Sequence, residues 1–121
     1  MRIVLCCVLV GLSLGSAFAQ KNVRTYHDPM QRQIHEDYFV SVADGTTLEG
    51  PYKRYFPNGK LEISGTFEDG RRSGIFYEYN SRGALVRKIA YLNGTRHGAV
   101  EVYNDKGVVI QRALYQNGLL I

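Results

Sequence analysis

The chain has little of what usually cross-links or interrupts a small fold. Its 121 residues include no tryptophan, three prolines and two cysteines. Both cysteines, Cys6 and Cys7, lie in the first apolar segment, so the rest of the chain has no thiol for a disulfide or a thiolate metal site. A chain this short forms one domain at most, with a small core that depends on backbone pairing or on a partner for stability.

A strong charge of one sign is also missing. Lysine and arginine outnumber aspartate and glutamate by 15 to 11, which gives a formal net charge of +4. This excess is too small to indicate nucleic-acid binding. The composition is 45% hydrophobic and 21% charged, which is typical of a globular chain and excludes general disorder.

The one long apolar run lies at the start of the chain. Met1–Arg2 precede the apolar residues 3–14, and Ala17-Phe18-Ala19 has the small-x-small pattern of a signal peptidase site before Gln20. The run is shorter than the roughly 20 residues that span a bilayer. We therefore expect a signal peptide over 1–19 and an exported protein, periplasmic or secreted; an uncleaved anchor is the alternative.

The remainder of the chain repeats with a period of 24 residues. The copies are 50–73, 74–97 and 98–121, without an insertion between them, and a degenerate half-copy precedes them at 38–45. Such a period predicts stacked copies of one supersecondary unit. Four columns are identical in all three copies: Gly50, Gly74 and Gly98; Tyr55, Tyr79 and Tyr103; Gly59, Gly83 and Gly107; Gly70, Gly94 and Gly118.

Each copy predicts two strands and two turns. Asn58-Gly59 and Asp69-Gly70 are typical hairpin turns, and the segments between them are rich in Tyr, Phe, Val and Ile. The fold expected for 38–121 is all-β: a single-layer antiparallel meander of about seven strands built from β-hairpin repeats. Asp28-Pro29 resembles a helix start, so we expect a linker or a short capping helix over 20–37. The expected strands are 38–43, 50–56, 60–67, 74–79, 84–91, 98–103 and 108–115.

Alternation along the strands assigns two faces. One face carries the more apolar set, which includes Tyr52, Phe67, Phe76 and Tyr91, and is the expected core face. This pairing places Phe67 opposite Gly74, where an aromatic ring covers bare backbone. The other face carries a spaced row of tyrosines together with cationic side chains, and these are the candidate partner-binding residues: Tyr55, Tyr77, Tyr79, Tyr103, Lys88 and Arg112.

The segment from Gly50 to Leu61 reads GPYKRYFPNGKL, and Gly65 to Gly74 reads GTFEDGRRSG. This pattern resembles the variant MORN repeat and is similar to bacterial proteins of the YwqK-type antitoxin family. The resemblance covers about 38–121. It implies an elongated β-hairpin array used for protein contacts, self-association or lipid contact, and it brings no catalytic residue onto this chain.

No motif for catalysis is recognisable. The three histidines, His27, His35 and His97, form no nucleophilic triad or zinc-protease pattern, and no phosphate-binding glycine loop is present. His35-Glu36-Asp37 with His27 is the only combination that resembles a metal site, and a solvated polar segment is the favoured interpretation. We therefore expect no enzyme, no catalytic residue, no cofactor and no metal.

The function expected is that of an exported repeat protein that binds a protein partner or acts as a scaffold. Two alternatives stay open: an antitoxin-like or immunity-like protein that neutralises an effector, and an envelope protein that binds anionic lipid or glycan. The expected partner is an unidentified protein, with weak contact to an anionic membrane surface and self-association as further options, and nucleic acid is not expected.

Overall fold

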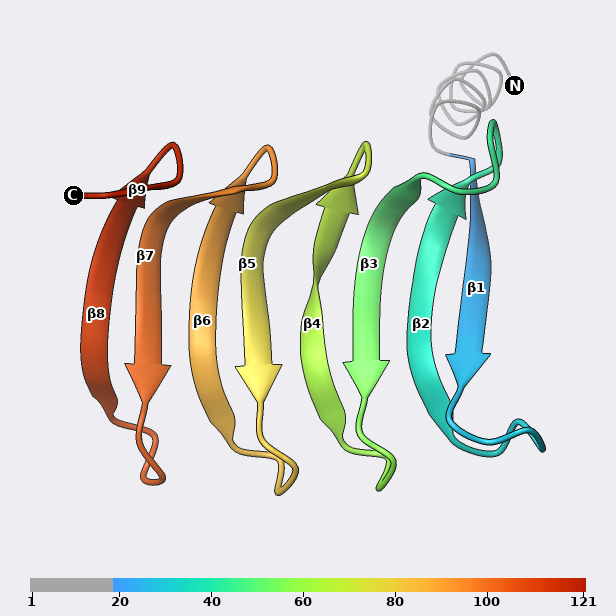
Figure 1. Ribbon diagram of the computed structural model, residues 1–121, viewed down its shortest axis with the longest axis horizontal. Helices are drawn as coiled ribbons and strands as arrows, with labels where there is room; N and C mark the ends of the chain where they lie inside the picture. The colour runs from blue at the N-terminus through green and yellow to red at the C-terminus, as the bar shows by residue number, and fades with distance from the viewer. Residues whose placement is uncertain (1–18) are drawn as a thin grey trace, which may run out of the picture.

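The computed structural model describes residues 19–121, which form one nine-stranded antiparallel sheet in the order β1 to β9 (Figure 1). Every strand pairs with its neighbours in the chain, so the connectivity is a simple meander. The strands are β1 (Gln20–Tyr26), β2 (Ile34–Ser41), β3 (Leu48–Tyr55), β4 (Leu61–Glu68), β5 (Arg71–Tyr79), β6 (Leu85–Leu92), β7 (Thr95–Tyr103), β8 (Val109–Gln116) and β9 (Leu119–Leu120).

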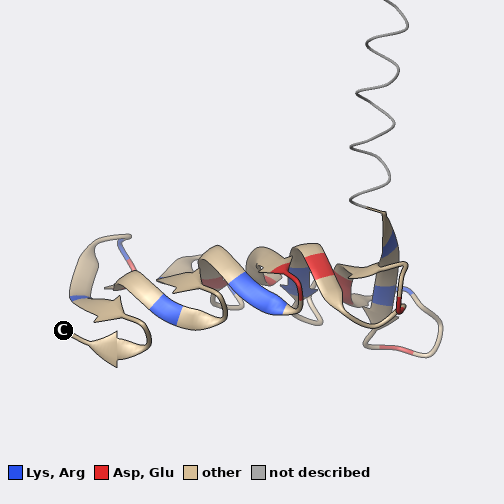
Figure 2. Cartoon of the chain, turned by 90° about the horizontal axis from the view of Figure 1, so that it is seen from above, with Lys and Arg blue, Asp and Glu red and all other residues tan. Residues whose placement is uncertain are grey.

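The sheet is a single layer. Seen from above, its strands follow one another along a long thin body, and within 19–121 nothing is packed on either side (Figure 2). The sheet is open, with β1 at one edge and β9 at the other. The predicted all-β meander of hairpin repeats is therefore confirmed, although it has nine strands where about seven were expected. The predicted signal peptide lies, except for Ala19, outside the described residues.

The expected linker or short capping helix over 20–37 is corrected by the structure, which has no helix there and an unexpected strand. Residues 20–26 form the edge strand β1, which pairs with β2 from Gln20↔Ser41 to Tyr26↔Ile34. Asp28 does cap backbone N–H groups, since its Oδ1 accepts from Arg32 N at 2.9 Å and Gln33 N at 2.8 Å. A carboxylate that accepts hydrogen bonds from free N–H groups can begin a helix, but in this chain it stabilises a turn between two strands.

A backbone hydrogen bond that joins each copy to the residues before it explains the glycine of the second turn. In Asp69-Gly70 and Asn93-Gly94 both residues have positive φ, as a two-residue hairpin turn requires. The glycine N–H then donates to a strand carbonyl of the preceding hairpin, Gly70 to Leu48 at 2.9 Å and Gly94 to Arg72 at 3.0 Å. The turn of Asn117-Gly118 repeats this bond with Arg96 at 2.8 Å. The 24-residue period therefore fixes contacts between hairpins as well as within them.

Bulges set the register. The register shifts in each of the seven pairings from β1·β2 to β7·β8. The shift is one residue in β1·β2, β3·β4, β5·β6 and β7·β8, and two residues in β2·β3, β4·β5 and β6·β7. Because of these shifts Phe67 lies opposite Gly50 and Tyr91 opposite Gly74, so the prediction of Phe67 opposite Gly74 is wrong. Each ring therefore faces the first glycine of its own copy. On the other side of β4, the shift in β4·β5 places Arg72, and not Gly74, opposite Phe67.

The core lies on one side of the sheet. Val40, Phe76 and Ile89 are the buried apolar side chains, at 3%, 1% and 2% exposure, and the register places all three on one face. We call this side the packed face, and the side that carries Lys53, Tyr77 and Lys88 the opposite face. The predicted two-faced pattern, with Phe67, Phe76 and Tyr91 on the core side, is confirmed.

The final residues fold back onto the sheet. Leu119 and Leu120 form β9 against Tyr115 and Gln116, and Ile121 N donates to Leu114 O at 2.9 Å. These side chains remain exposed, so the tail extends the sheet edge and leaves the packed face uncovered. In the described part of the chain no helix is long and apolar enough to cross a membrane.

Candidate functional site

The packed face carries a continuous array of aromatic rings. Five rings from β2 to β6 lie in sequence, with centroid distances of 5.9 Å for Tyr38–Tyr52, 5.4 Å for Tyr52–Phe67, 5.6 Å for Phe67–Phe76 and 5.3 Å for Phe76–Tyr91. The last three pairs meet edge to face, which is a favourable geometry. Rings from adjacent strands therefore support one another across four pairings of the sheet.

A hollow of about 330 Å³ opens over the first part of this array. Three rings, two arginines and one glutamate meet there from four neighbouring strands, and Thr46 of the preceding loop closes one side. The lining residues are Glu36, Tyr38, Thr46, Leu48, Tyr52, Arg54, Ile63, Phe67 and Arg72.

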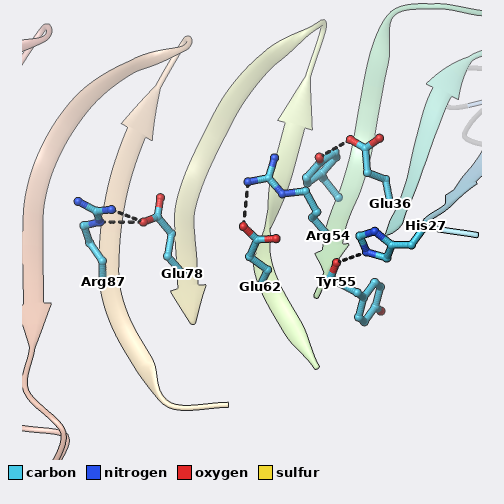
Figure 3. A network of polar contacts seen from close by, with 8 residues as sticks. His27, Glu36, Arg54, Tyr55, Glu62, Glu78 and Arg87 are labelled. Carbon is cyan, nitrogen blue, oxygen red and sulfur yellow. Dashed lines mark hydrogen bonds and ion pairs between the residues drawn. The ribbon is translucent and has the colours of Figure 1, made fainter. Parts of the chain in front are cut away.

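Polar side chains at one end of the hollow are joined by hydrogen bonds (Figure 3). The Tyr52 hydroxyl donates to Glu36 Oε2 at 2.6 Å, and Arg54 Nη2 donates to Glu62 Oε2 at 3.2 Å. Partial burial, and then the hydrogen bond to Glu36, raise the pKa of Tyr52 to about 12. Burial acts to lower the pKa of Arg54, but the hydrogen bond and charge of Glu62 together with Tyr52 outweigh it, so the net shift is upward. Tyr52 and Arg54 therefore keep their protons at neutral pH.

At the β5–β6 end of the ring array, and beyond it on β7 and β8, arginine side chains pack against the aromatic rings. Arg72 lies over the rings of Phe76 and Tyr91, at 4.9 Å and 5.2 Å from the centroids, and Nη1 donates to the Tyr91 hydroxyl at 2.9 Å. Arg96, which is 24 residues later, makes the equivalent contacts with Tyr115. Its guanidinium lies 5.3 Å from the ring centroid, and its Nη1 donates to the Tyr115 hydroxyl at 3.3 Å. Cation–π contact combined with a hydrogen bond fixes each guanidinium against the sheet.

The opposite face brings together three of the predicted partner-binding residues. Tyr77, Lys88 and Arg112 lie in one row across the strands, because the register pairs Ser64 with Tyr77, Tyr77 with Lys88, Lys88 with Glu101 and Glu101 with Arg112. Lys88 Nζ lies 5.8 Å from the Tyr77 ring centroid, and Arg112 Nε lies 3.2 Å from Glu101 Oε2. The row is thus an ordered line of aromatic, cationic and anionic side chains.

The other three predicted residues, Tyr55, Tyr79 and Tyr103, end β3, β5 and β7 on the same face. Among the described residues none of them forms an aromatic pair with another, as expected for side chains two strands apart. The Tyr103 hydroxyl donates to Glu101 at 3.1 Å, and burial together with this bond raises the pKa of Tyr103. Tyr55 also lines a cleft beside the 27–33 turn, where His27 Nε2 donates to its carbonyl at 2.9 Å (Figure 3).

The remaining sequence candidates are dispersed. Within residues 19–121 no three His, Cys, Asp or Glu side chains meet as a metal site, although the His27 and His35 rings lie 4.3 Å apart. The cationic residues form no single row, since Arg72, Arg87 and Arg96 lie on the packed face while Lys88 and Arg112 lie on the opposite face. This separation weakens the case for a basic membrane-binding surface.

From the sequence alone, Glu36 was considered only as a possible metal ligand, and it was not brought together with Arg54, Glu62 and Arg72. Register pairs Glu36 with Arg54, which are 18 positions apart, only because of the shift between Tyr38 and Val40. A further shift between Arg54 and Tyr55 brings Glu62 within 3.2 Å of Arg54. Reading charges along one strand cannot reveal such pairs. The one sequence signal for this cluster is that arginine occupies the same position in two copies, at Arg72 and Arg96.

Comparison with known proteins agrees with this architecture. Two segments, residues 48–69 and 96–117, match the model of the MORN repeat variant. Each match covers one hairpin with its turn and supports the description of the chain as a MORN repeat protein. No curated protein matches the chain. A β-meander of such repeats fits a repeat scaffold or binding module.

Proposed function

We propose that the chain is an exported, non-enzymatic module that binds a partner protein through its opposite face. The observation that carries the proposal is the row of Tyr77, Lys88 and Arg112, with the three strand-end tyrosines on the same face. Tyrosine and arginine are the side chains that most often supply binding energy at protein interfaces. Ile75 and Leu114, each 44% exposed, add apolar area to the same face.

The geometry of the face supports docking of a folded protein surface. The strands that carry Tyr77, Lys88 and Glu101 are hydrogen-bonded on both sides, and β8, which carries Arg112, pairs along its length with β7. These side chains therefore stand on a paired backbone, which limits the entropy lost on binding. The ion pair of Arg112 with Glu101 fixes one cation in advance. A partner with acidic and apolar groups in a line matches this arrangement.

Export is the second part of the proposal. Cleavage after Ala19 leaves Gln20, the first residue of β1, at the new N-terminus and keeps every strand pairing intact. Fractionation of cells, followed by N-terminal sequencing of the mature protein, tests this part. A chain that starts at Gln20 in the exported fraction supports it, and an intact chain in the cytoplasm contradicts it.

Copurification from the native host tests partner binding. The tagged protein is compared with a Tyr77→Ala/Arg112→Ala variant and with a control, Arg82→Ala/Lys106→Ala, which removes two cations from exposed turns. We expect one stoichiometric protein with the wild type and the control, and about tenfold less with the face variant, as loss of interface anchors implies. Equal recovery with both variants contradicts the proposal.

A narrower version follows from the resemblance to YwqK-type antitoxins: the partner is an exported effector that the chain neutralises. It predicts that the copurified protein is toxic to the host when it is produced without this chain. A harmless partner excludes the antitoxin role and leaves the binding module in place.

A further inference from the structure

We propose that the hollow on the packed face binds an uncharged carbohydrate, with a pyranose ring seated on Tyr52 and Phe67. This site is separate from the protein-binding face, because the two lie on opposite sides of a single-layer sheet. It would give the module a second ligand without interference between the two.

The floor of the hollow suits a sugar ring. Tyr38, Tyr52 and Phe67 follow one another at centroid distances of 5.9 Å and 5.4 Å, so they present adjoining aromatic surface. The C–H groups on one side of a pyranose carry slight positive charge and pack against the negative face of an aromatic ring. The volume of about 330 Å³ lies at the small end of ligand pockets, which suits one or two sugar rings.

The rim provides both partners that a hydroxyl group requires. Glu36 accepts hydrogen bonds, Arg54 and Arg72 donate them, and Thr46 does either. Sugar hydroxyls donate and accept at once, so a rim of mixed donors and acceptors satisfies them. Tyr52 and Glu62 hold the Glu36 carboxylate and the Arg54 guanidinium in place before a ligand arrives.

Charge balance favours an uncharged ligand. Two cations, Arg54 and Arg72, and one anion, Glu36, line the hollow, and a second anion, Glu62, forms an ion pair with Arg54 at 3.2 Å. A phosphate or carboxylate placed near Arg54 would also approach Glu36 and Glu62, which repel it. A cationic ligand is likewise repelled by the two arginines. A neutral polyol can bond to every one of these groups without a net electrostatic penalty.

Binding is tested by two-dimensional ¹H–¹⁵N NMR of the purified protein with three neutral probes: maltotriose, cellotriose and N,N′,N″-triacetylchitotriose, each to about 20 mM, a concentration that detects a Kd in the millimolar range. We expect saturable shifts from at least one probe, largest at the amides of residues 36–38, 46–54 and 67–72. No saturable shift with any of the three overturns the proposal, and so do shifts confined to the opposite face.

Two variants and one further probe separate the explanations. Phe67→Leu keeps an apolar side chain but removes the aromatic surface, and we expect affinity to fall by about fivefold or more. Tyr77→Leu, the same kind of change on the opposite face, should leave affinity unchanged. Equal loss with both variants overturns the proposal. Tighter binding of glucose 6-phosphate than of glucose also overturns it, because that result identifies an anion site.

Discussion

The ring of Phe76 lies directly over Gly65 on the neighbouring strand. A Cβ atom built on Gly65 would come within 2.6 Å of three atoms of that ring, which is closer than real side chains approach. Phe76 is the largest fully buried side chain of the described chain. Gly65→Ala is therefore expected to lower the free energy of unfolding by about 1–3 kcal/mol, the usual cost of overpacking. Urea denaturation followed by circular dichroism measures it.

The same substitution in a Phe76→Leu background is the control. A smaller side chain at position 76 leaves room for the added methyl group, so the further cost of Gly65→Ala should be smaller there than in the wild type. An equal cost in both backgrounds would show that the ring is not the cause.

Arg72 and Arg96 occupy equivalent places in successive copies, which makes them a matched pair. Arg72 contacts two rings and donates to Tyr91 at 2.9 Å, whereas Arg96 contacts one ring, is exposed, and donates to Tyr115 at 3.3 Å. Replacing arginine by lysine removes the planar stacking group. We expect Arg72→Lys to cost about 1 kcal/mol of unfolding free energy and Arg96→Lys less. The reverse order in thermal or urea denaturation would contradict the contacts described above.

Alkaline titration tests the bond between Tyr52 and Glu36. The pKa of Tyr52 is raised from 10.0 to about 12 in the folded state, so the neutral phenol stabilises the fold below pH 10 and this contribution is lost as the pH rises through about 12. Tyrosinate absorbance of the wild type is compared with that of Tyr52→Phe. We expect the difference between the two curves to show one tyrosine of the nine with a midpoint near 12. A midpoint near 10 would contradict the partial burial of Tyr52 together with its bond to Glu36.

Acid titration tests the loop before β3. Hydrogen bonds from the Thr47 side chain, the Thr47 N–H and the Thr46 N–H lower the pKa of Asp44 from 3.8 to about 2. A lowered folded-state pKa gives stability that is complete above pH 3.8 and is lost as the pH falls through about 2. The stability difference between the wild type and Asp44→Asn should therefore shrink across this interval. A difference that stays constant from pH 6 to about 2 would show that the carboxylate is not responsible.

Much of the fold is readable from the sequence because the repeat encodes it locally. Asn93-Gly94 and its equivalents specify tight turns, and alternation between turns specifies which side chains share a face. These two signals were enough to place Tyr77, Lys88 and Arg112 on one side of the sheet. Both signals act within a single hairpin. Because the hairpin recurs every 24 residues, the same signals predict the structure of each copy.

The rest depends on pairing between distant residues. Bulges such as the shift between Tyr38 and Val40 decide which side chains meet across strands, and no local pattern predicts them. For this reason the hollow with Glu36 and Arg54 was not predicted. Asp28 was misleading for another reason: an aspartate that caps free N–H groups looks the same in sequence at a helix start and in a turn.

Solution NMR of the isotope-labelled protein tests most directly whether the 24-residue copies stand side by side in one sheet. Cross-strand nuclear Overhauser effects are expected to join Ser64 with Tyr77 between the first two copies, and Lys88 with Glu101 between the second and third. Observation of both contacts, with extended-strand patterns through Leu61–Glu68 and Leu85–Leu92, is the predicted result. Helical patterns in those strands, or the absence of contacts between copies, would contradict the single sheet and every proposal that rests on its two faces.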